Sequence, residues 1–138
     1  KKDDDKIPIL GICLGMQLMT KSSQEGKEKG LGWIEAETIR FDFSGFEKKA
    51  RIPHMGWNTV VKNKNHKIID NLDIDNSRFY FVHSYYVQCS NKDDILLTCN
   101  YIINFTAAFH KDNIIGTQFH PEKSHKFGMK IFKNFLKL

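Results

Sequence analysis

An apolar run ends in a cysteine that is framed by two glycines. Residues 8–19 read PILGICLGMQLM, so Gly11 and Gly15 each stand two positions from Cys13. A buried cysteine needs no such frame. A cysteine on a sharp strand-to-helix turn does, because side chains two positions away would clash with neighbouring elements. This pattern matches the G-x-S-x-G nucleophile elbow with sulfur in place of oxygen. It predicts a nucleophilic Cys13 at a helix N-terminus, where the dipole favours thiolate.

The composition indicates one soluble globular domain and excludes several classes of protein. The chain has 138 residues, of which 41% are hydrophobic and 27% charged. No apolar run approaches the ~18 residues of a membrane-spanning helix, and nothing at the start reads as a signal peptide. The net charge is +5, but the lysines are spread along the chain and accompany no groove-reading motif. We therefore expect neither nucleic-acid nor membrane binding.

The cysteine count favours a reducing compartment. Cys13, Cys89 and Cys99 lie far apart and form no C-x-x-C pair, which argues against a disulfide framework and fits a cytoplasmic protein. Cys89 and Cys99 fall in apolar strand patterns, so we interpret both as core residues. No second cysteine or histidine stands at ligand spacing from Cys13, so no metal site is predicted.

The hydrophobic pattern predicts short strands between two helices. Residues 7–10 (IPIL) are apolar at every position, which predicts a strand buried on both faces of a parallel sheet. Residues 126–138 carry apolar and lysine side chains mainly on opposite sides of a helix. The other predicted elements are a helix at 14–21, a polar loop at 22–32, strands at 33–43, 78–89, 95–101, 105–110 and 114–119, a loop leading into a strand at 50–61, and a turn at 112–113.

A histidine at the end of a predicted strand is the best candidate base for Cys13. His120 follows the strand at 114–119, and Pro121 and Glu122 come next. Residues i and i+2 of an extended chain point to the same side, so Glu122 can reach the His120 ring. Pro121 cannot continue a ladder. A carboxylate that holds a histidine facing a cysteine is the nucleophile–base–orienter arrangement.

The five other histidines are weaker candidates. His83 lies inside an aromatic strand, where a histidine is more often a hydrogen-bonded core residue than a base. His54 lies in an irregular segment with a proline and a glycine. The remaining three stand in polar surroundings and are expected to be solvated surface imidazoles: His66, His110 and His125.

Together these motifs resemble the class I (triad) glutamine amidotransferases, and within them the HisH glutaminase subunits of imidazole glycerol phosphate synthase. The matching stretches are residues 11–17, 30–32, 53–58 (PHMGWN), 79–86 (FYFVHSYY) and 116–124 (GTQFHPEKS). The resemblance implies an α/β, flavodoxin-like mixed sheet with flanking helices. It also implies that residues 1–138 are the C-terminal two-thirds of a single domain, which lacks the glycine-rich loop that supplies the family's second oxyanion donor. Residues 1–6 are expected to be a charged lead-in or a tag remnant.

The resemblance also implies a role for each site residue. Cys13 would attack the side-chain amide of glutamine, His120 would shuttle the proton, and Glu122 would orient His120. The Leu14 backbone N–H would be one oxyanion donor. The residues that would hold the substrate are Gln17, Glu25, Ser84 and Tyr85. The residues that would lie at the partner surface are Met55, Trp57, Asn58 and Tyr80.

The activity implied is a cofactor-free glutaminase that hydrolyses L-glutamine to glutamate and ammonia. The ammonia would pass to a (β/α)8 synthase subunit, the partner in a heterodimer, which makes imidazole glycerol phosphate and AICAR in histidine biosynthesis. Residues 104–108 and 124–129 are also similar to paralogues that supply ammonia for acetamidino sugars. Two further alternatives are a general cysteine hydrolase, which would not need Gln17 and Glu25, and a non-catalytic docking fragment.

Overall fold

The computed structural model describes residues 6–23 and 29–138, so the predicted substrate contact of Glu25 lies outside the described residues. The strands are β1 Ile9–Ile12, β2 Ser22–Ser23, β3 Ala36–Arg40, β4 His54–Asn58, β5 Val61–Lys62, β6 Phe79–His83, β7 Tyr85–Cys89, β8 Ile95–Tyr101, β9 Ile103–Lys111 and β10 Ile114–Thr117. The α-helices are α1 Leu14–Leu18 and α2 His125–Leu136, and the 3-10 turns are η1 Lys67–Ile69, η2 Ile74–Asn76, η3 Lys92–Asp94 and η4 Pro121–Lys123.

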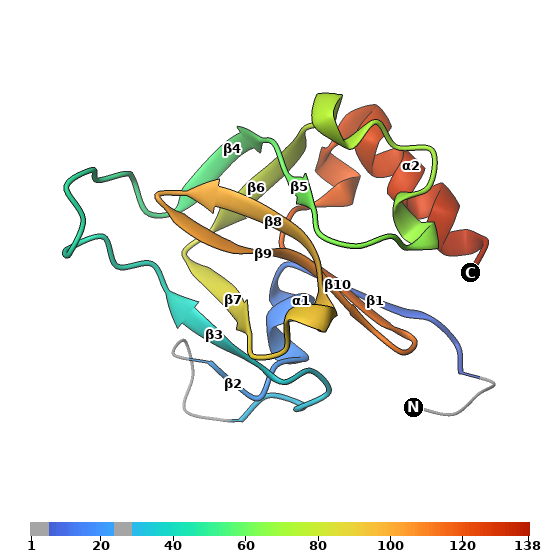
Figure 1. Cartoon of the computed structure of the whole chain (residues 1–138), viewed down its shortest axis with the longest axis horizontal. Coiled ribbons are helices and arrows are strands. Elements are labelled where there is room, and N and C mark those ends of the chain that lie inside the picture. The colour runs from blue at the N-terminus through green and yellow to red at the C-terminus, as the bar shows by residue number, and fades with distance from the viewer. Residues whose placement is uncertain (1–5, 24–28) are drawn as a thin grey trace.

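A mixed sheet and a separate two-stranded ribbon form the body of the described chain (Figure 1). The sheet runs in the order β1-β10-β9-β7-β3-β2, while β8 pairs with β9 and carries β5. Strands β1 and β10 pair in parallel, as do β2 and β3, and the other pairs are antiparallel. The ribbon consists of β4 and β6, paired antiparallel.

The prediction of one long strand over 78–89 is wrong. The segment divides at Ser84: β6 joins β4 in the ribbon, and β7 joins β3 in the main sheet. The Ser84 carbonyl leaves the ladder and accepts a hydrogen bond from the Phe41 N–H at 3.0 Å. The aromatic pattern continues through the break, because both halves bury side chains in the same core.

The strand predicted at 7–10 is a parallel strand, as expected, but its predicted bounds and its predicted burial on both faces are wrong. The strand is β1, two residues later, and Ile7 is 79% exposed. Within the described residues β1 pairs only with β10. Ile9 and Leu10 are half-buried and pack against different hydrophobic clusters, as alternating side chains of a strand must. Each face of β1 is therefore covered in part.

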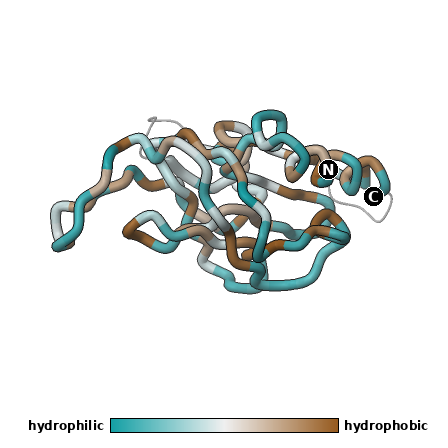
Figure 2. Tube along the Cα trace, turned by 90° about the horizontal axis from the view of Figure 1, so that it is seen from above, coloured by the Kyte–Doolittle hydropathy of each residue, from teal (hydrophilic) through white to brown (hydrophobic). Residues whose placement is uncertain are grey.

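The larger hydrophobic cluster lies between the sheet, the ribbon and α2. Its largest fully buried side chains include Phe41, Phe79, Phe81 and Phe119. Helix α2 buries Ile131 against this cluster and leaves lysines exposed, which confirms the predicted amphipathic helix. Figure 2 shows hydrophobic and hydrophilic segments alternating along the coil that ends at C. No helix among the described residues is long and apolar enough to cross a membrane.

Candidate active site

Cys13 occupies a tight turn between β1 and α1. Its backbone angles are φ 52° and ψ −104°, a conformation that residues with a side chain rarely adopt and that is found mostly at functional sites. The Cys13 N–H donates to the Thr117 carbonyl at 2.7 Å, and the Cys13 carbonyl accepts from the Gln17 N–H at 3.1 Å. The strand, turn and helix follow one another as the glycine frame predicts, although α1 ends at Leu18 and is shorter than the predicted helix over 14–21.

Only one of the two framing glycines is sterically required. A Cβ at Gly11 would lie 2.9 Å from the backbone of Gly15 and 2.7 Å from the Met19 Cε. A Cβ at Gly15 would meet no described atom within 4 Å, so the predicted clash at Gly15 is wrong. The crowding is one-sided. A Cβ at Gly11 would point at the Gly15 backbone, whereas the space that a Cβ at Gly15 would occupy is empty.

The Cys13 sulfur lies between the ribbon and the segment that follows β10. Its Sγ donates to the Val82 carbonyl at 3.8 Å and accepts from the Gln118 Nε2 at 3.5 Å. Two elements far apart in the sequence therefore fix the position of the thiol. Neither contact belongs to the triad that the sequence predicts.

His120 and Glu122 form the predicted pair. The His120 Nδ1 lies 2.7 Å from the Glu122 Oε2. Since that contact requires a proton on Nδ1, the neutral ring presents its unprotonated Nε2 as a base. The His120 side chain is 18% exposed and that of Glu122 is 48% exposed, so the carboxylate is partly hydrated and the imidazole is mostly shielded.

Strand β6 brings His120 to the same region as Cys13. The His120 N–H donates to the Tyr80 carbonyl at 2.9 Å, and the thiol contacts the carbonyl of Val82 on the same strand. Two residues of a strand span about 7 Å, so Cys13 and His120 are anchored to neighbouring points of β6. The Ser124 hydroxyl reinforces this arrangement by accepting from the Tyr80 N–H and donating to the His120 carbonyl.

A cavity of about 320 Å³ opens beside the thiol. It is lined by Cys13, Leu14, Gln17, Pro53, Val82, His83, Ser84 and Tyr85. Gln17 is 6% exposed, and its Nε2 donates to the Tyr85 carbonyl and to the Gln118 Oε1, both at 3.3 Å. The Leu14 N–H has no acceptor within residues 6–23 and 29–138, as the first N–H groups of a helix usually do not. The structure thus gathers four predicted substrate residues around Cys13: Leu14, Gln17, Ser84 and Tyr85.

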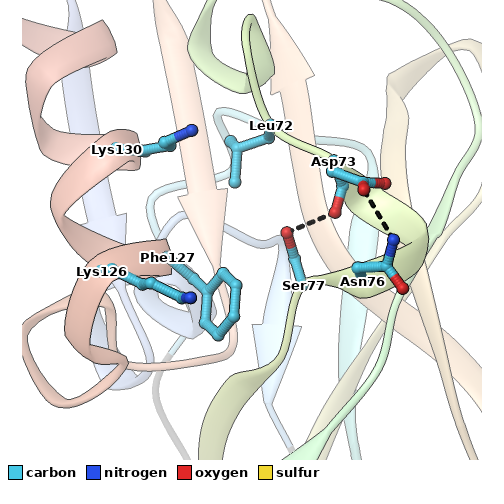
Figure 3. A pocket seen from close by; sticks show the side chains of 7 residues that line it. All are labelled: Leu72, Asp73, Asn76, Ser77, Lys126, Phe127 and Lys130. Atoms are coloured by element: carbon cyan, nitrogen blue, oxygen red, sulfur yellow. Dashed lines mark hydrogen bonds between the residues drawn. The ribbon is translucent and has the colours of Figure 1, made fainter.

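A second cavity, of about 270 Å³, lies between α2 and the residues around η2 (Figure 3). Its lining includes Asp73, Asn76 and Ser77, which bond to one another: Ser77 Oγ to the Asp73 carbonyl at 2.7 Å, and Asn76 Nδ2 to Asp73 Oδ2 at 2.6 Å. It contains neither a cysteine nor a histidine. The cavity beside Cys13 is therefore the candidate active site.

Two groups that contact the Cys13 sulfur were not found from the sequence. Gln118 stands two positions before His120 on an extended segment, so the same-side rule that links His120 to Glu122 would also have placed it near the site. Val82 acts through its backbone carbonyl, and the sequence carries no signal for it. His83 was predicted to be a hydrogen-bonded core residue, and it is buried and bonded, but it also lines the cavity.

The other two cysteines are unsuited to compete with Cys13 as nucleophiles. Burial raises the pKa of the Cys99 thiol to about 12 and that of Cys89 to about 11. Cys99 is buried as predicted, whereas Cys89 is half-buried against the smaller hydrophobic cluster. The described residues contain no group of three or more His, Cys, Asp or Glu side chains placed to hold a metal ion.

The prediction of solvated imidazoles is wrong for two histidines. His66 and His110 are half-buried, with ring centroids 4.1 Å apart. Burial lowers the pKa of His66 to about 4 and also lowers the pKa of His110. His66 stands in a polar sequence but caps η1 by accepting from the Ile68 N–H at 3.0 Å, which draws its ring inward. His125 is exposed as predicted, and its ring stacks on Trp57 at 5.4 Å.

Three of the four predicted partner residues form an exposed apolar patch on the ribbon. Met55 is 61% exposed and Trp57 is 44% exposed. Trp57 pairs with the half-buried Tyr80 across the ribbon, and their rings meet edge to face at 5.9 Å. Asn58 differs, because its amide forms hydrogen bonds within the chain, to His54, Thr59 and Asn100.

The sequence profile described as "Glutamine amidotransferase class-I" matches residues 2–138. The chain belongs to the class I glutamine amidotransferases. "Imidazole glycerol phosphate synthase subunit HisH 2" of Methanococcus maripaludis is 60% identical over 133 residues, which are 96% of this chain and 64% of that protein. The protein of the same name from Pseudomonas aeruginosa is 53% identical over 131 residues, which are 95% of this chain and 63% of that protein. The chain therefore spans slightly less than two thirds of the length of these two curated relatives.

Solved structures agree with this family assignment at the level of the fold. A crystal structure of a Thermoplasma acidophilum protein, assigned to GMP synthase, matches with a TM-score of 0.68. The match covers 97% of this chain and 58% of that one at 24% identity. The predicted mixed α/β amidotransferase fold is confirmed, and so is the resemblance to HisH subunits.

Proposed function

We propose that the protein containing this chain is a cytoplasmic glutaminase that hydrolyses L-glutamine and delivers ammonia to a synthase subunit. The observation that carries the proposal is the strained turn at Cys13, which presents a thiol to a cavity anchored to the same strand as the His120–Glu122 pair. The names of the two HisH relatives support the choice of glutamine and of imidazole glycerol phosphate synthesis.

The reaction divides into acylation and deacylation of Cys13. In acylation, the sulfur attacks the side-chain amide carbon of glutamine, and the His120 Nε2 takes the thiol proton. The same nitrogen returns this proton to the amide nitrogen, which leaves as ammonia. A thioester remains on Cys13. In deacylation, His120 takes a proton from water, the hydroxyl adds to the thioester carbon, and glutamate leaves as the thiol is restored.

The other lining groups would bind and polarise the substrate. The Leu14 N–H, which has no acceptor in the described part of the chain, would donate to the oxyanion of the tetrahedral intermediate. Gln17, Ser84 and Tyr85 would contact the amino-acid end of glutamine, since they line the cavity beside the thiol. Glu122 would stabilise the imidazolium that forms on His120 in each half-reaction.

The exposed patch of Met55, Trp57 and Tyr80 would bind the (β/α)8 synthase subunit. The patch and the thiol contact lie on one ribbon, because Met55 pairs with Val82 and the Val82 carbonyl accepts from the Cys13 Sγ. Large exposed aromatic side chains of this kind are enriched at interface anchors. Ammonia released at Cys13 would therefore enter the partner near the docking site.

A cysteine replacement series tests the proposed reaction. In the intact protein with its synthase subunit, Cys13→Ser should lower glutamate formation by at least ~10³-fold, because a neutral hydroxyl is a far weaker nucleophile than a thiolate. Cys89→Ser is the matched control and should retain the rate. Near-normal turnover by Cys13→Ser would disprove the proposal.

A further inference from the structure

A chain of hydrogen bonds joins the surface of the ribbon to the wall of the active-site cavity. Asn58 Nδ2 contacts His54 Nε2 at 3.2 Å, His54 Nδ1 contacts His83 Nε2 at 3.0 Å, and His83 Nδ1 contacts the Tyr85 carbonyl at 2.7 Å. This series of hydrogen bonds starts at Asn58, the residue after Trp57 on β4, and ends at Tyr85, the first residue of β7.

The direction of these hydrogen bonds is fixed at the Asn58 end. The Asn58 Oδ1 accepts from the Thr59 N–H at 2.8 Å, and its Nδ2 also donates to the Asn100 carbonyl at 3.2 Å. These two bonds set the orientation of the amide, so Nδ2 is the atom that donates to His54 Nε2. His54 must then donate from Nδ1 to His83 Nε2, and His83 must donate from Nδ1 to Tyr85.

Both imidazoles are held in place and neutral. The His54 ring lies between Tyr101 at 4.0 Å and Phe81 at 4.8 Å, stacked on both, while the His83 ring packs on Phe105 at 5.0 Å. Burial lowers the pKa of His54 to about 4 and that of His83 to about 3. Each ring therefore carries one proton on its nitrogens near neutral pH, as a directed chain requires.

The last hydrogen bond of the series, from His83, ends on the backbone carbonyl of Tyr85, a residue that lines the cavity. The Tyr85 carbonyl accepts both from His83 and from Gln17 Nε2, which lines the same cavity. Tyr85 follows the break at Ser84, where the chain passes from the ribbon to the main sheet. Because no ladder bridges Ser84, the side chains of His83 and Gln17 supply bonds that hold this carbonyl.

We propose that Asn58, His54 and His83 are positioning residues that set the Tyr85 carbonyl for glutamine binding and connect it to the partner-binding face of β4. The proposal rests on the proposed function, since it concerns the same cavity and partner. Synthase binding to the exposed side of β4 would then shift His54, and the shift would reach the cavity through His83.

The first test is independent of activity. Ring ¹⁵N NMR of the intact, histidine-labelled protein near neutral pH should show His54 and His83 as neutral imidazoles protonated on Nδ1. Addition of the synthase subunit should shift both signals and leave that of His66, which lies outside the chain of bonds, in place. An Nε2-protonated or cationic ring at either position, or unchanged signals in the complex, would overturn the proposal.

The second test separates the two ends of His83. In His83→Asn the amide nitrogen would lie near the position of the lost Nδ1, whereas in His83→Gln the longer side chain would place its amide near the position of the lost Nε2. At saturating synthase subunit, both variants should raise the glutamine KM. His83→Gln should raise it about fivefold or more, the value of roughly one hydrogen bond, because it loses the bond to Tyr85. His83→Asn should raise it by less, because it keeps that bond and loses only the contact with His54. Equal KM values for the two variants would contradict the role of Tyr85.

A variant at the half-buried Asn58 keeps the test decisive if the variants at the buried His83 do not fold. Asn58→Ala should change the tautomer signals of His54 and raise the glutamine KM at saturating partner, with Thr59→Ala as the unaffected control. If the effect of Asn58→Ala on the glutamine KM disappears at saturating synthase subunit, the variant weakens partner binding alone, and the proposed connection from Asn58 to Tyr85 is refuted. If wild-type protein shows the predicted tautomers and partner-induced shifts but makes no glutamate, the proposed function fails while the chain of bonds stands.

Discussion

The backbone N–H of Cys13 donates to the Thr117 carbonyl at 2.7 Å, three residues before His120. This bond continues the parallel register of β1 and β10, in which Ile12 stands opposite Thr117. The candidate nucleophile and the candidate base therefore leave the carboxyl ends of two adjacent parallel strands. Ligand sites of α/β proteins commonly form at such an edge.

The one-sided crowding around Cys13 predicts opposite outcomes for its two glycines. Gly11→Ala would press a Cβ against the Gly15 backbone and Met19, and it should lower the free energy of unfolding by ~1–3 kcal/mol. Gly15→Ala meets open space, and it should leave stability unchanged or raise it by up to ~1 kcal/mol, because alanine favours the helix. Urea denaturation of both variants measures the difference. Equal destabilisation would show that both glycines are crowded.

The charge of Glu122 should matter more than its shape. Glu122→Gln retains an oxygen for the His120 Nδ1–H but removes the carboxylate that stabilises the imidazolium, so kcat should fall by ~10²–10⁴. Lys123→Gln, at the next position, which is also exposed, is the control and should keep kcat. Steady-state glutaminase kinetics in the complex measure both. A Glu122→Gln rate within threefold of wild type would exclude the orienting role.

Buried histidines should make the folded state acid-sensitive. The folded-state pKa values of His54 and His66 are about 4 and that of His83 about 3, all below the ordinary value of 6.5. Protons therefore bind more tightly to the unfolded chain. The stability contributed by the neutral rings is fully present above pH 6.5 and decreases as the pH falls from 6.5 towards 4.

Thermal or urea unfolding between pH 7 and pH 5 measures this acid sensitivity. His83→Asn should reduce the pH dependence, because it removes one such proton site. A stability independent of pH over this range would show that the rings are accessible to protons in the folded state.

The sequence predicted the parts of the site that depend on local rules. The turn at Cys13 follows from steric crowding around a glycine, and the His120–Glu122 contact follows from the same-side geometry of an extended chain. Both constraints act between residues at most four positions apart.

The sequence could not predict what depends on which sheet a strand joins. The aromatic pattern of 78–89 is continuous, yet the chain changes sheets at Ser84, because the loop after β3 supplies a donor from Phe41. The inward position of Asn58 likewise depends on a carbonyl of β8, that of Asn100. Long-range pairing decided both features, and no local propensity encodes it.

The exposed patch on the ribbon gives a sharp test of the partner surface. Trp57 is 44% exposed, meets the Tyr80 ring edge to face and stacks on the His125 ring. Such a preorganised aromatic side chain is suited to anchor an interface, so Trp57→Ala should weaken binding of the synthase subunit by ~10–30-fold. It should also separate glutamate formation from ammonia transfer, because the patch lies beside the thiol contact at Val82.

Leu136→Ala, at an 82% exposed position on α2, controls for the loss of an exposed apolar side chain. Titration calorimetry with the synthase subunit measures the affinity, and paired glutaminase and synthase assays measure the transfer. Affinity within twofold of wild type, together with full ammonia transfer, would place the docking surface elsewhere on the protein.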